Sequence, residues 1–224
     1  MVQVDYRCGG VPRYYISGGD DAALLMRVPD AVRKCVAFLC QKQPTGAYVA
    51  GGTVFFASVP REDGAGDHIY LVTNRHCVHG TRYVRLNVQT AEGQPCGFRY
   101  LEVQERHWTV PCDDTVDLAV TLWRPYPTSE LLEVDPLPLG MLATRDILKR
   151  ENIGIGDTIF YTGLFTRHQQ TIRNIPIVRM GTIAAMPEEP FYDEQLGKFE
   201  TYIVETRSLR GLSGCPVFVG LQER

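Results

Sequence analysis

Short hydrophobic runs rich in β-branched and aromatic residues recur along most of this chain. Clusters of glycine, proline and acidic residues separate these runs, as at residues 44–46, 62–67 and 92–95. Runs of this length that are bounded by turn residues predict β-strands. The predicted strands cover residues 32–39, 52–58, 69–73, 83–88, 98–105 and 118–123, followed by 158–162, 175–180, 182–185, 199–206 and 216–220.

A proline-rich stretch divides the predicted strands into two groups. It covers residues 124–152, and proline at this density resists both helix and central strand, which favours a linker. A short helix is expected within it, over residues 144–151. The chain is therefore predicted to contain an N-terminal extension (1–29), a first β lobe (30–123), this linker and a second β lobe (153–224). Many short strands spaced in this way predict an all-β fold of antiparallel barrels or sandwiches.

Composition narrows the class of protein and its partners. The chain has 224 residues, of which 44% are hydrophobic, and a net charge of −3, which gives no support for a nucleic-acid or anionic-membrane partner. No window approaches the roughly 18 apolar residues of a membrane span, and the first residues do not resemble a secretory signal. The seven cysteines are odd in number and lack C-x-x-C spacing. These features predict a soluble cytoplasmic protein with reduced thiols.

Three residues far apart in the sequence have the side chains of a nucleophilic site. They are His76, Asp117 and Ser213, and they occur in that order. A serine hydroxyl is a poor nucleophile until a histidine takes its proton and a carboxylate holds that histidine in the useful tautomer. His76 and Asp117 fall at predicted strand ends of the first lobe, whereas Ser213 falls in a turn of the second. We therefore expect a catalytic site between the lobes.

Two glycines flank this serine turn. Gly211 is expected to adopt a backbone conformation that a Cβ would penalise, which turns its N–H toward the same point as the N–H of Ser213. Two such donors form an oxyanion hole, worth roughly 3–4 kcal/mol per donor. Gly214 is expected to leave space beside the nucleophile for the substrate backbone.

Four segments in this order resemble the chymotrypsin/trypsin-like serine peptidases, and most closely their intracellular bacterial members. The segments are residues 51–56 (GGTVFF), 71–77 (LVTNRHC), 117–120 (DLAV) and 211–216 (GLSGCP), and the resemblance runs from about Pro29 to the C-terminus. It implies two antiparallel β-barrels with the site between them. It also implies hydrolysis of protein or peptide substrates through an acyl-enzyme, with no cofactor. His76 would be the general base, Asp117 its orienter and Ser213 the nucleophile.

The sequence departs from the family pattern at three places. Members that are activated by cleavage carry an aspartate where this chain has Leu212, so that switch is absent. Secreted members pair the cysteine after the catalytic histidine with an earlier one, but here the partner position of Cys77 is Ala50, which predicts a free thiol. The family also continues for two strands after the serine turn. Two explanations stay open: a truncated chain, or a partner strand or domain that completes the second barrel.

The sequence also bears on functions other than a peptidase. An alternative is a catalytically dormant protease-fold interaction module that lacks its last strands. A viral-type peptidase has no distinctive sequence support. No metal site is predicted, because His76 and its neighbour Cys77 would point to opposite faces of a strand. An α/β-hydrolase is excluded because its triad runs in the order Ser, Asp, His, and Cys215 replaces the last glycine of its G-x-S-x-G turn.

Substrate preference is predicted from one cation. Arg207 lies six residues before Ser213, where the resemblance implies the floor of the pocket for the substrate's P1 side chain. A cation there would favour acidic P1 residues, unless it pairs with Glu205 or another acid at the surface. We expect peptides with P1 Asp or Glu to be cleaved faster than matched peptides with P1 Lys or Leu. A preference for P1 Lys would contradict this assignment.

Overall fold

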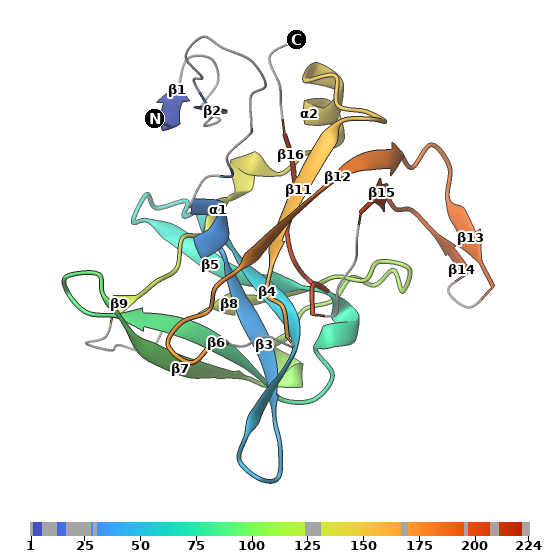
Figure 1. The fold of residues 1–224 in the computed structure, drawn as a ribbon. Helices are drawn as coiled ribbons and strands as arrows, with labels where there is room; N and C mark the ends of the chain where they lie inside the picture. The colour runs from blue at the N-terminus through green and yellow to red at the C-terminus, as the bar shows by residue number, and fades with distance from the viewer. Residues whose placement is uncertain are drawn as a thin grey trace.

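The fold is dominated by two antiparallel β-sheets, which confirms the predicted all-β class (Figure 1). We describe it from a computed structural model. The structure describes residues 2–5, 13–16, 28, 31–123, 131–166, 170–194, 197–206 and 211–220. The first sheet has eight strands and the second has four.

The first sheet gathers the strands predicted for the first lobe. Its main path runs through β7 (Pro95–Val103), β6 (Arg82–Gln89), β3 (Val36–Lys42), β4 (Tyr48–Pro60), β5 (Asp67–Thr73) and β8 (Ala119–Trp123). All neighbours along this path are antiparallel. Two short strands join it from the predicted linker: β9 (Leu131–Leu132) pairs with β6, and β10 (Leu137–Pro138) pairs in parallel with β4.

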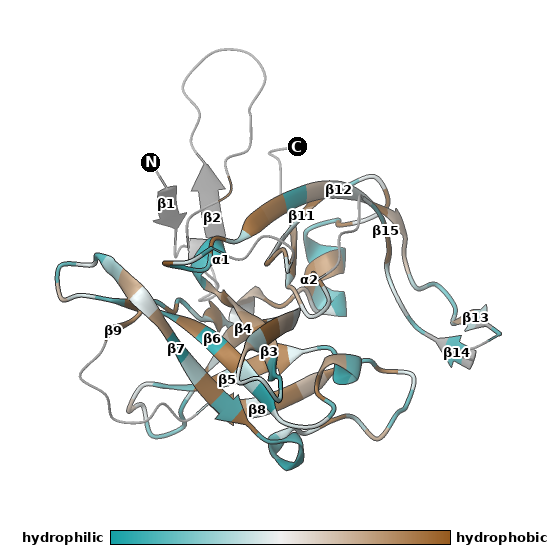
Figure 2. Ribbon diagram, turned by 60° about the horizontal axis from the view of Figure 1, so that its bottom comes forward, coloured by the Kyte–Doolittle hydropathy of each residue, from teal (hydrophilic) through white to brown (hydrophobic). Residues whose placement is uncertain are grey.

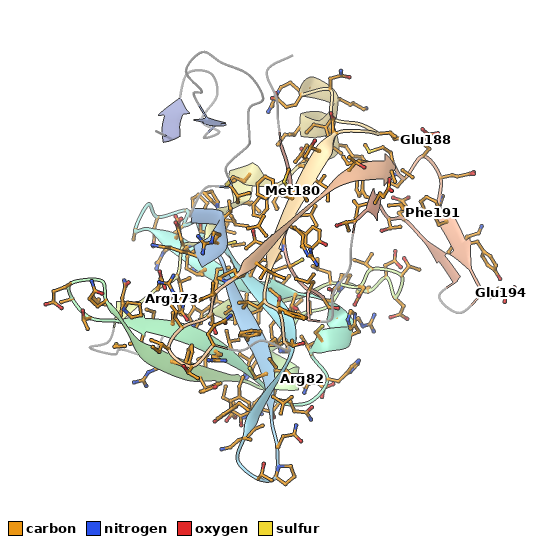
Figure 3. All side chains as sticks on the ribbon, viewed as in Figure 1. Arg82, Arg173, Met180, Glu188, Phe191 and Glu194 are labelled. Atoms are coloured by element: carbon orange, nitrogen blue, oxygen red, sulfur yellow. The ribbon has the colours of Figure 1, made fainter. Side chains whose placement is uncertain are left out.

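The second sheet is smaller. Its order is β15 (Ile203–Glu205), β12 (Ile177–Ala185), β11 (Thr158–Gly163) and β16 (Val217–Val219). Two hairpins stand apart from both sheets, β1 (Val2–Asp5) with β2 (Arg13–Ile16) and β13 (Phe191–Asp193) with β14 (Gly197–Phe199). The second hairpin lies on an arm at one side of the molecule, where Figure 3 labels Phe191 and Glu194.

Helices are few and short among the described residues. They are α1 (Ala31–Lys34), α2 (Arg145–Arg150) and three 3₁₀ helices, η1 (Arg75–Cys77), η2 (Glu105–His107) and η3 (Leu139–Met141). The helix expected over residues 144–151 is confirmed as α2. The Thr144 side chain accepts a hydrogen bond from the Ile147 N–H and so caps its first turn. None of the described helices is long and apolar enough to cross a membrane.

Several details of the strand prediction were wrong. Residues 199–206 do not form one strand, because β14 ends at Phe199 and β15 covers only Ile203–Glu205. Residues 32–34 belong to α1 rather than to the first strand. Residues 175–180 and 182–185 do not form two strands, because β12 continues through Gly181, which pairs with Ile159. Gly181 permits a close approach here, since a Cβ at this position would overlap the carbonyl oxygen of Glu205. The described strand pairs also leave both sheets open rather than closed into barrels, with β7 and β8 at the ends of the first.

Three clusters of buried hydrophobic side chains hold these elements together. The first cluster consists mainly of side chains from the first sheet, and the third consists of side chains from the second sheet, α2 and neighbouring segments. Figure 2 shows the hydrophobic residues concentrated on the strands, with hydrophilic residues in the loops. The second cluster joins the two sheets, because Leu164, which follows β11, and Phe218 of β16 belong to the same cluster as Cys35 and Phe38 of the first lobe. Each large apolar side chain buried here stabilises the fold by roughly 1.5–3 kcal/mol.

A polar contact also fixes one lobe on the other. Asn174, which precedes β12, is buried; its side-chain amide donates to the Arg85 carbonyl oxygen at 2.6 Å and its N–H donates to Asn87 Oδ1 at 2.6 Å. The buried Arg85 guanidinium donates to the Gln170 carbonyl oxygen at 2.6 Å. Arg173, labelled in Figure 3, lies 3.9 Å from Glu133. Residues 170–174 are thereby held on the first sheet.

Burial of three thiols makes the stability of the fold sensitive to alkaline pH. Burial raises the pKa of Cys35 from 9.0 to about 12, and the pKa values of Cys40 and Cys215 from 9.0 to about 11. Above pH 9 the unfolded chain ionises these thiols while the folded chain keeps them protonated. Their stabilising contribution is therefore complete below pH 9 and is lost as pH rises toward 11–12.

We expect the free energy of unfolding to fall above pH 9 by roughly 1.4 kcal/mol per pH unit for each buried thiol. Denaturant titrations between pH 7 and 10.5 measure this slope. Cys35→Ala should make it shallower, whereas Cys96→Ala, at an exposed position, should leave it unchanged. Equal slopes in all three proteins would contradict the assignment.

Candidate active site

His76 lies at the exposed end of strand β5. The strand ends at Thr73, and the chain then forms the short 3₁₀ helix η1, which contains His76. His76 and Cys77 were predicted to point to opposite faces of a strand, but both residues lie in this helix instead. Among the described residues, no group of three or more His, Cys, Asp or Glu side chains is arranged to hold a metal ion.

Asp117 holds His76 through two hydrogen bonds. Its Oδ2 lies 2.7 Å from His76 Nδ1, and its Oδ1 accepts from the His76 backbone N–H at 3.0 Å. A carboxylate at Nδ1 favours the tautomer with the proton on Nδ1, which leaves the lone pair on Nε2. This is the orientation that a general base requires.

The electrostatics of Asp117 agree with this geometry. Partial burial acts to raise the pKa of Asp117, but hydrogen bonds from the backbone N–H and the imidazole of His76 outweigh it. The pKa of Asp117 is consequently lowered, so the carboxylate stays ionised at neutral pH and can stabilise a positive charge on the imidazole.

Two further contacts tie the loop of Asp117 to the segment around His76. The Asn74 side-chain amide donates to the Asp117 carbonyl oxygen at 2.9 Å. Arg75 Nη1 lies 2.7 Å from Asp114 Oδ1. The ion pair is exposed and contributes only about 0–1 kcal/mol, so the amide and the two bonds to His76 do more to define the position of Asp117.

The serine turn comes from the second lobe and is anchored by its neighbours. Ser213 is exposed, whereas Leu212 is 7% exposed and packs in the third hydrophobic cluster. The turn is closed by a hydrogen bond from the Cys215 N–H to the Leu212 carbonyl oxygen at 3.0 Å. Burying Leu212 on one side of the turn therefore presents Ser213 on the other.

The structure brings the serine turn against the His76 segment at Gly52. The Thr53 N–H donates to the Ser213 carbonyl oxygen at 2.9 Å. A Cβ built on Gly52 would lie 3.4 Å from that oxygen and 3.2 Å from the Sγ of Cys77, the residue after His76. Ser213 and Cys77 are thus neighbours across a glycine. Within the described part of the chain, the Ser213 hydroxyl makes no hydrogen bond to His76.

The two glycines of the turn have different environments. The backbone conformation predicted for Gly211 is confirmed, since its φ is +98° and a Cβ would overlap Thr166 and lie 3.0 Å from the Leu164 carbonyl oxygen. The expectation for Gly214 was wrong. Its φ is +86°, and a Cβ there would overlap the Thr53 carbonyl oxygen and Thr73 Oγ1, so Gly214 allows the turn to pack on the first sheet rather than leaving space for substrate.

Of the remaining predictions, the one for Cys77 is confirmed, whereas those for Arg207 and the oxyanion hole are not tested. Cys77 is a free thiol, as predicted, and burial followed by the charge of Asp117 raises its pKa. Arg207 lies outside the described residues, so its role in a P1 pocket stays a prediction. The oxyanion hole of Gly211 and Ser213 stays a prediction as well, because residues 207–210 are not described.

Sequence reasoning missed three residues that organise the site. Thr53, Thr73 and Asn74 all lie within segments 51–56 and 71–77, but the sequence predicts no role for them. Their partners are far away in sequence: Thr53 Oγ1 bonds Gly211, which is 158 residues away, and the Asn74 amide bonds Asp117, which is 43 residues away. The one available signal was a hydroxyl residue directly after the Gly51–Gly52 pair.

Known proteins similar to this chain are found among solved structures. No family model matches the chain, and no curated protein matches it. Among solved structures, a crystal structure of Deg5 is similar with 15% identity and a TM-score of 0.47, covering 85% of this chain and 76% of that one. The Grass clip serine protease of the Drosophila Toll pathway is similar with 13% identity and a TM-score of 0.44, covering 91% and 70%. At these values neither likeness assigns an activity to this chain.

Two alanine substitutions separate the effect of close packing at Gly214 from the effect of its left-handed backbone conformation. Gly46 has the same φ of +86°, but nothing lies within 4 Å of its Cβ position. Gly46→Ala should therefore lose only the cost of a left-handed alanine, about 1–2 kcal/mol. Gly214→Ala should be less stable than Gly46→Ala and should also displace the serine turn. Thermal unfolding of both variants measures the difference, and equal losses would contradict the close packing.

Proposed function

We propose that this protein is a serine endopeptidase that cleaves peptide bonds through an acyl-enzyme on Ser213. The observation that carries the proposal is the His76–Asp117 pair, joined at 2.7 Å, in a segment that packs beside the exposed serine turn. The base and its orienter come from the first lobe and the nucleophile from the second. The sequence resemblance to chymotrypsin/trypsin-like peptidases supports the same roles.

In the proposed reaction, Ser213 Oγ attacks the carbonyl carbon of the substrate peptide while His76 Nε2 takes the hydroxyl proton. The imidazolium that forms is stabilised by the ionised Asp117. The proton then passes to the leaving amine, which departs and leaves the acyl-enzyme. Water activated by His76 attacks the ester and releases the second product. Proton transfer of this kind contributes typically 10²–10⁴-fold to the rate.

The N–H groups of Gly211 and Ser213 are proposed to bind the oxyanion. The positive φ of Gly211 supports this role, because it gives the turn a conformation that other residues rarely adopt. Each donor would stabilise the tetrahedral intermediate by roughly 3–4 kcal/mol.

A fluorophosphonate probe tests the nucleophile directly. We expect the wild-type protein to be labelled on Ser213, Ser213→Ala to remain unlabelled and Ser208→Ala to be labelled normally. Asp117→Asn should slow labelling by a factor on the order of 10³–10⁴, because the imidazole then loses its tautomer and its counter-charge. Circular dichroism checks that each variant is folded.

The outcome distinguishes the peptidase from the dormant alternative. A folded wild-type protein that is not labelled even at high probe concentration would contradict the peptidase proposal and favour the dormant alternative. Labelling that survives in Ser213→Ala would instead mean that another residue is the nucleophile.

A further inference from the structure

Thr53 occupies a central position between the two parts of the candidate site. It lies in the middle of β4, pairs with Phe38 of β3, and is 0% exposed. None of its polar atoms faces solvent, so each requires a partner inside the protein. Those partners lie in the serine turn, in the segment after β11, and in the strand that leads to His76.

The Thr53 hydroxyl joins two segments of the second lobe. It donates to the Gly211 carbonyl oxygen at 2.8 Å and accepts from the Leu164 N–H at 3.2 Å. Both contacts use the ordinary capacity of a hydroxyl, which has one proton and two lone pairs. Leu164 and Gly211 are themselves in close contact, so the hydroxyl is bonded where these two segments meet.

The backbone of Thr53 extends the same connection in both directions. Its N–H donates to the Ser213 carbonyl oxygen at 2.9 Å. Its carbonyl oxygen accepts from the buried Thr73 hydroxyl at 2.7 Å. Thr73 ends the strand from which His76 follows three residues later. One residue therefore bonds the turn of the nucleophile and the strand of the base.

Gly211 is the position where such a bond has the greatest effect. Its carbonyl group shares a peptide plane with the Leu212 N–H. Gly211 has a φ of +98°, and glycine has more conformational freedom than any other residue type. Without a fixed donor, this plane could rotate and carry the serine turn with it. The Thr53 hydroxyl supplies that donor from a different lobe and from a rigid central strand.

We propose that Thr53 is a positioning residue that fixes the Gly211–Leu212 peptide, and through it the position of Ser213 relative to His76. The role in catalysis rests on the proposed peptidase function. Thr53 itself does not contact the reacting atoms; it acts through the geometry of the turn.

Substitutions at Thr53 and Thr162 separate positioning from packing. Thr53→Val keeps the shape and removes the hydroxyl, whereas Thr53→Ser keeps the hydroxyl and removes a methyl group. Thr162→Val is the matched control, because Thr162 is also fully buried and its hydroxyl has no hydrogen-bond partner in the described structure. We expect Thr53→Val to slow fluorophosphonate labelling roughly 30-fold, and Thr53→Ser and Thr162→Val to stay within about threefold of the wild type.

Two further measurements identify the cause of the change. The loss should appear in kcat rather than KM, with the midpoints of the pH profile unchanged, because the acid and the base are untouched. Hydrogen exchange at the Leu164 amide should accelerate at least about tenfold in Thr53→Val and return to the wild-type rate in Thr53→Ser. If Thr53→Val does not fold, Thr53→Cys, whose thiol is a weaker donor, takes its place and should give an intermediate loss.

The results distinguish a failure of the proposed positioning role from a failure of the proposed peptidase function. A wild-type protein that is not labelled contradicts the peptidase function, and Leu164 exchange then decides alone whether Thr53 holds the turn. A labelled wild type with Thr53→Val reacting at the same rate overturns the positioning role. A Thr53→Ser variant as slow as Thr53→Val also overturns it, because the hydroxyl would then not be the cause.

Discussion

The contact between the serine turn and strand β4 is the constraint on which the candidate site depends. The Thr53 N–H bonds the Ser213 carbonyl oxygen, and the two segments also approach closely at Gly52. These segments are far apart in the sequence, since Thr53 and Gly211 are separated by 158 residues. The contact has a glycine on each side, with the closer approach at Gly214. A side chain at Gly52 would press on Cys77 and Ser213, and one at Gly214 would overlap Thr53 and Thr73. Glycine at both positions therefore allows the turn of Ser213 to lie against the strand that leads to His76.

Hydrophobic and polar contacts contribute differently to this arrangement. In the shared cluster around Phe38, Leu164 and Phe218, each large buried side chain contributes roughly 1.5–3 kcal/mol, against about 0.5–1.5 kcal/mol for each hydrogen bond between the lobes. Apolar packing alone does not define the register of one sheet against the other. The hydrogen bonds of Thr53 and Asn174 do so, because a displacement would leave their buried partners unsatisfied.

Sequence patterns predicted what depends on local runs of residues and on the order of the motifs. The periodic runs of Val, Ile and aromatic residues located most strands, and the order of His76, Asp117 and Ser213 identified a pair that the structure joins at 2.7 Å. What failed depends on distant residues. Gly214 resembles any turn glycine until Thr73 is placed against it, and Gly181 suggests a break until the backbone of β15 is seen to need the space. Thr53 looks like an ordinary strand residue because the two partners of its hydroxyl lie more than 100 positions away.

The environments of the two cysteines nearest His76 and Ser213 in sequence disfavour the thiolate form of both. Cys77 and Cys215 flank His76 and Ser213 in sequence, and thiols are intrinsically the better nucleophiles. Burial raises the pKa of Cys215 to about 11, and burial together with the negative charge of Asp117 raises that of Cys77. Both thiols therefore stay protonated at neutral pH. The carboxylate that holds His76 thus has a second effect, since its negative charge disfavours a thiolate at Cys77.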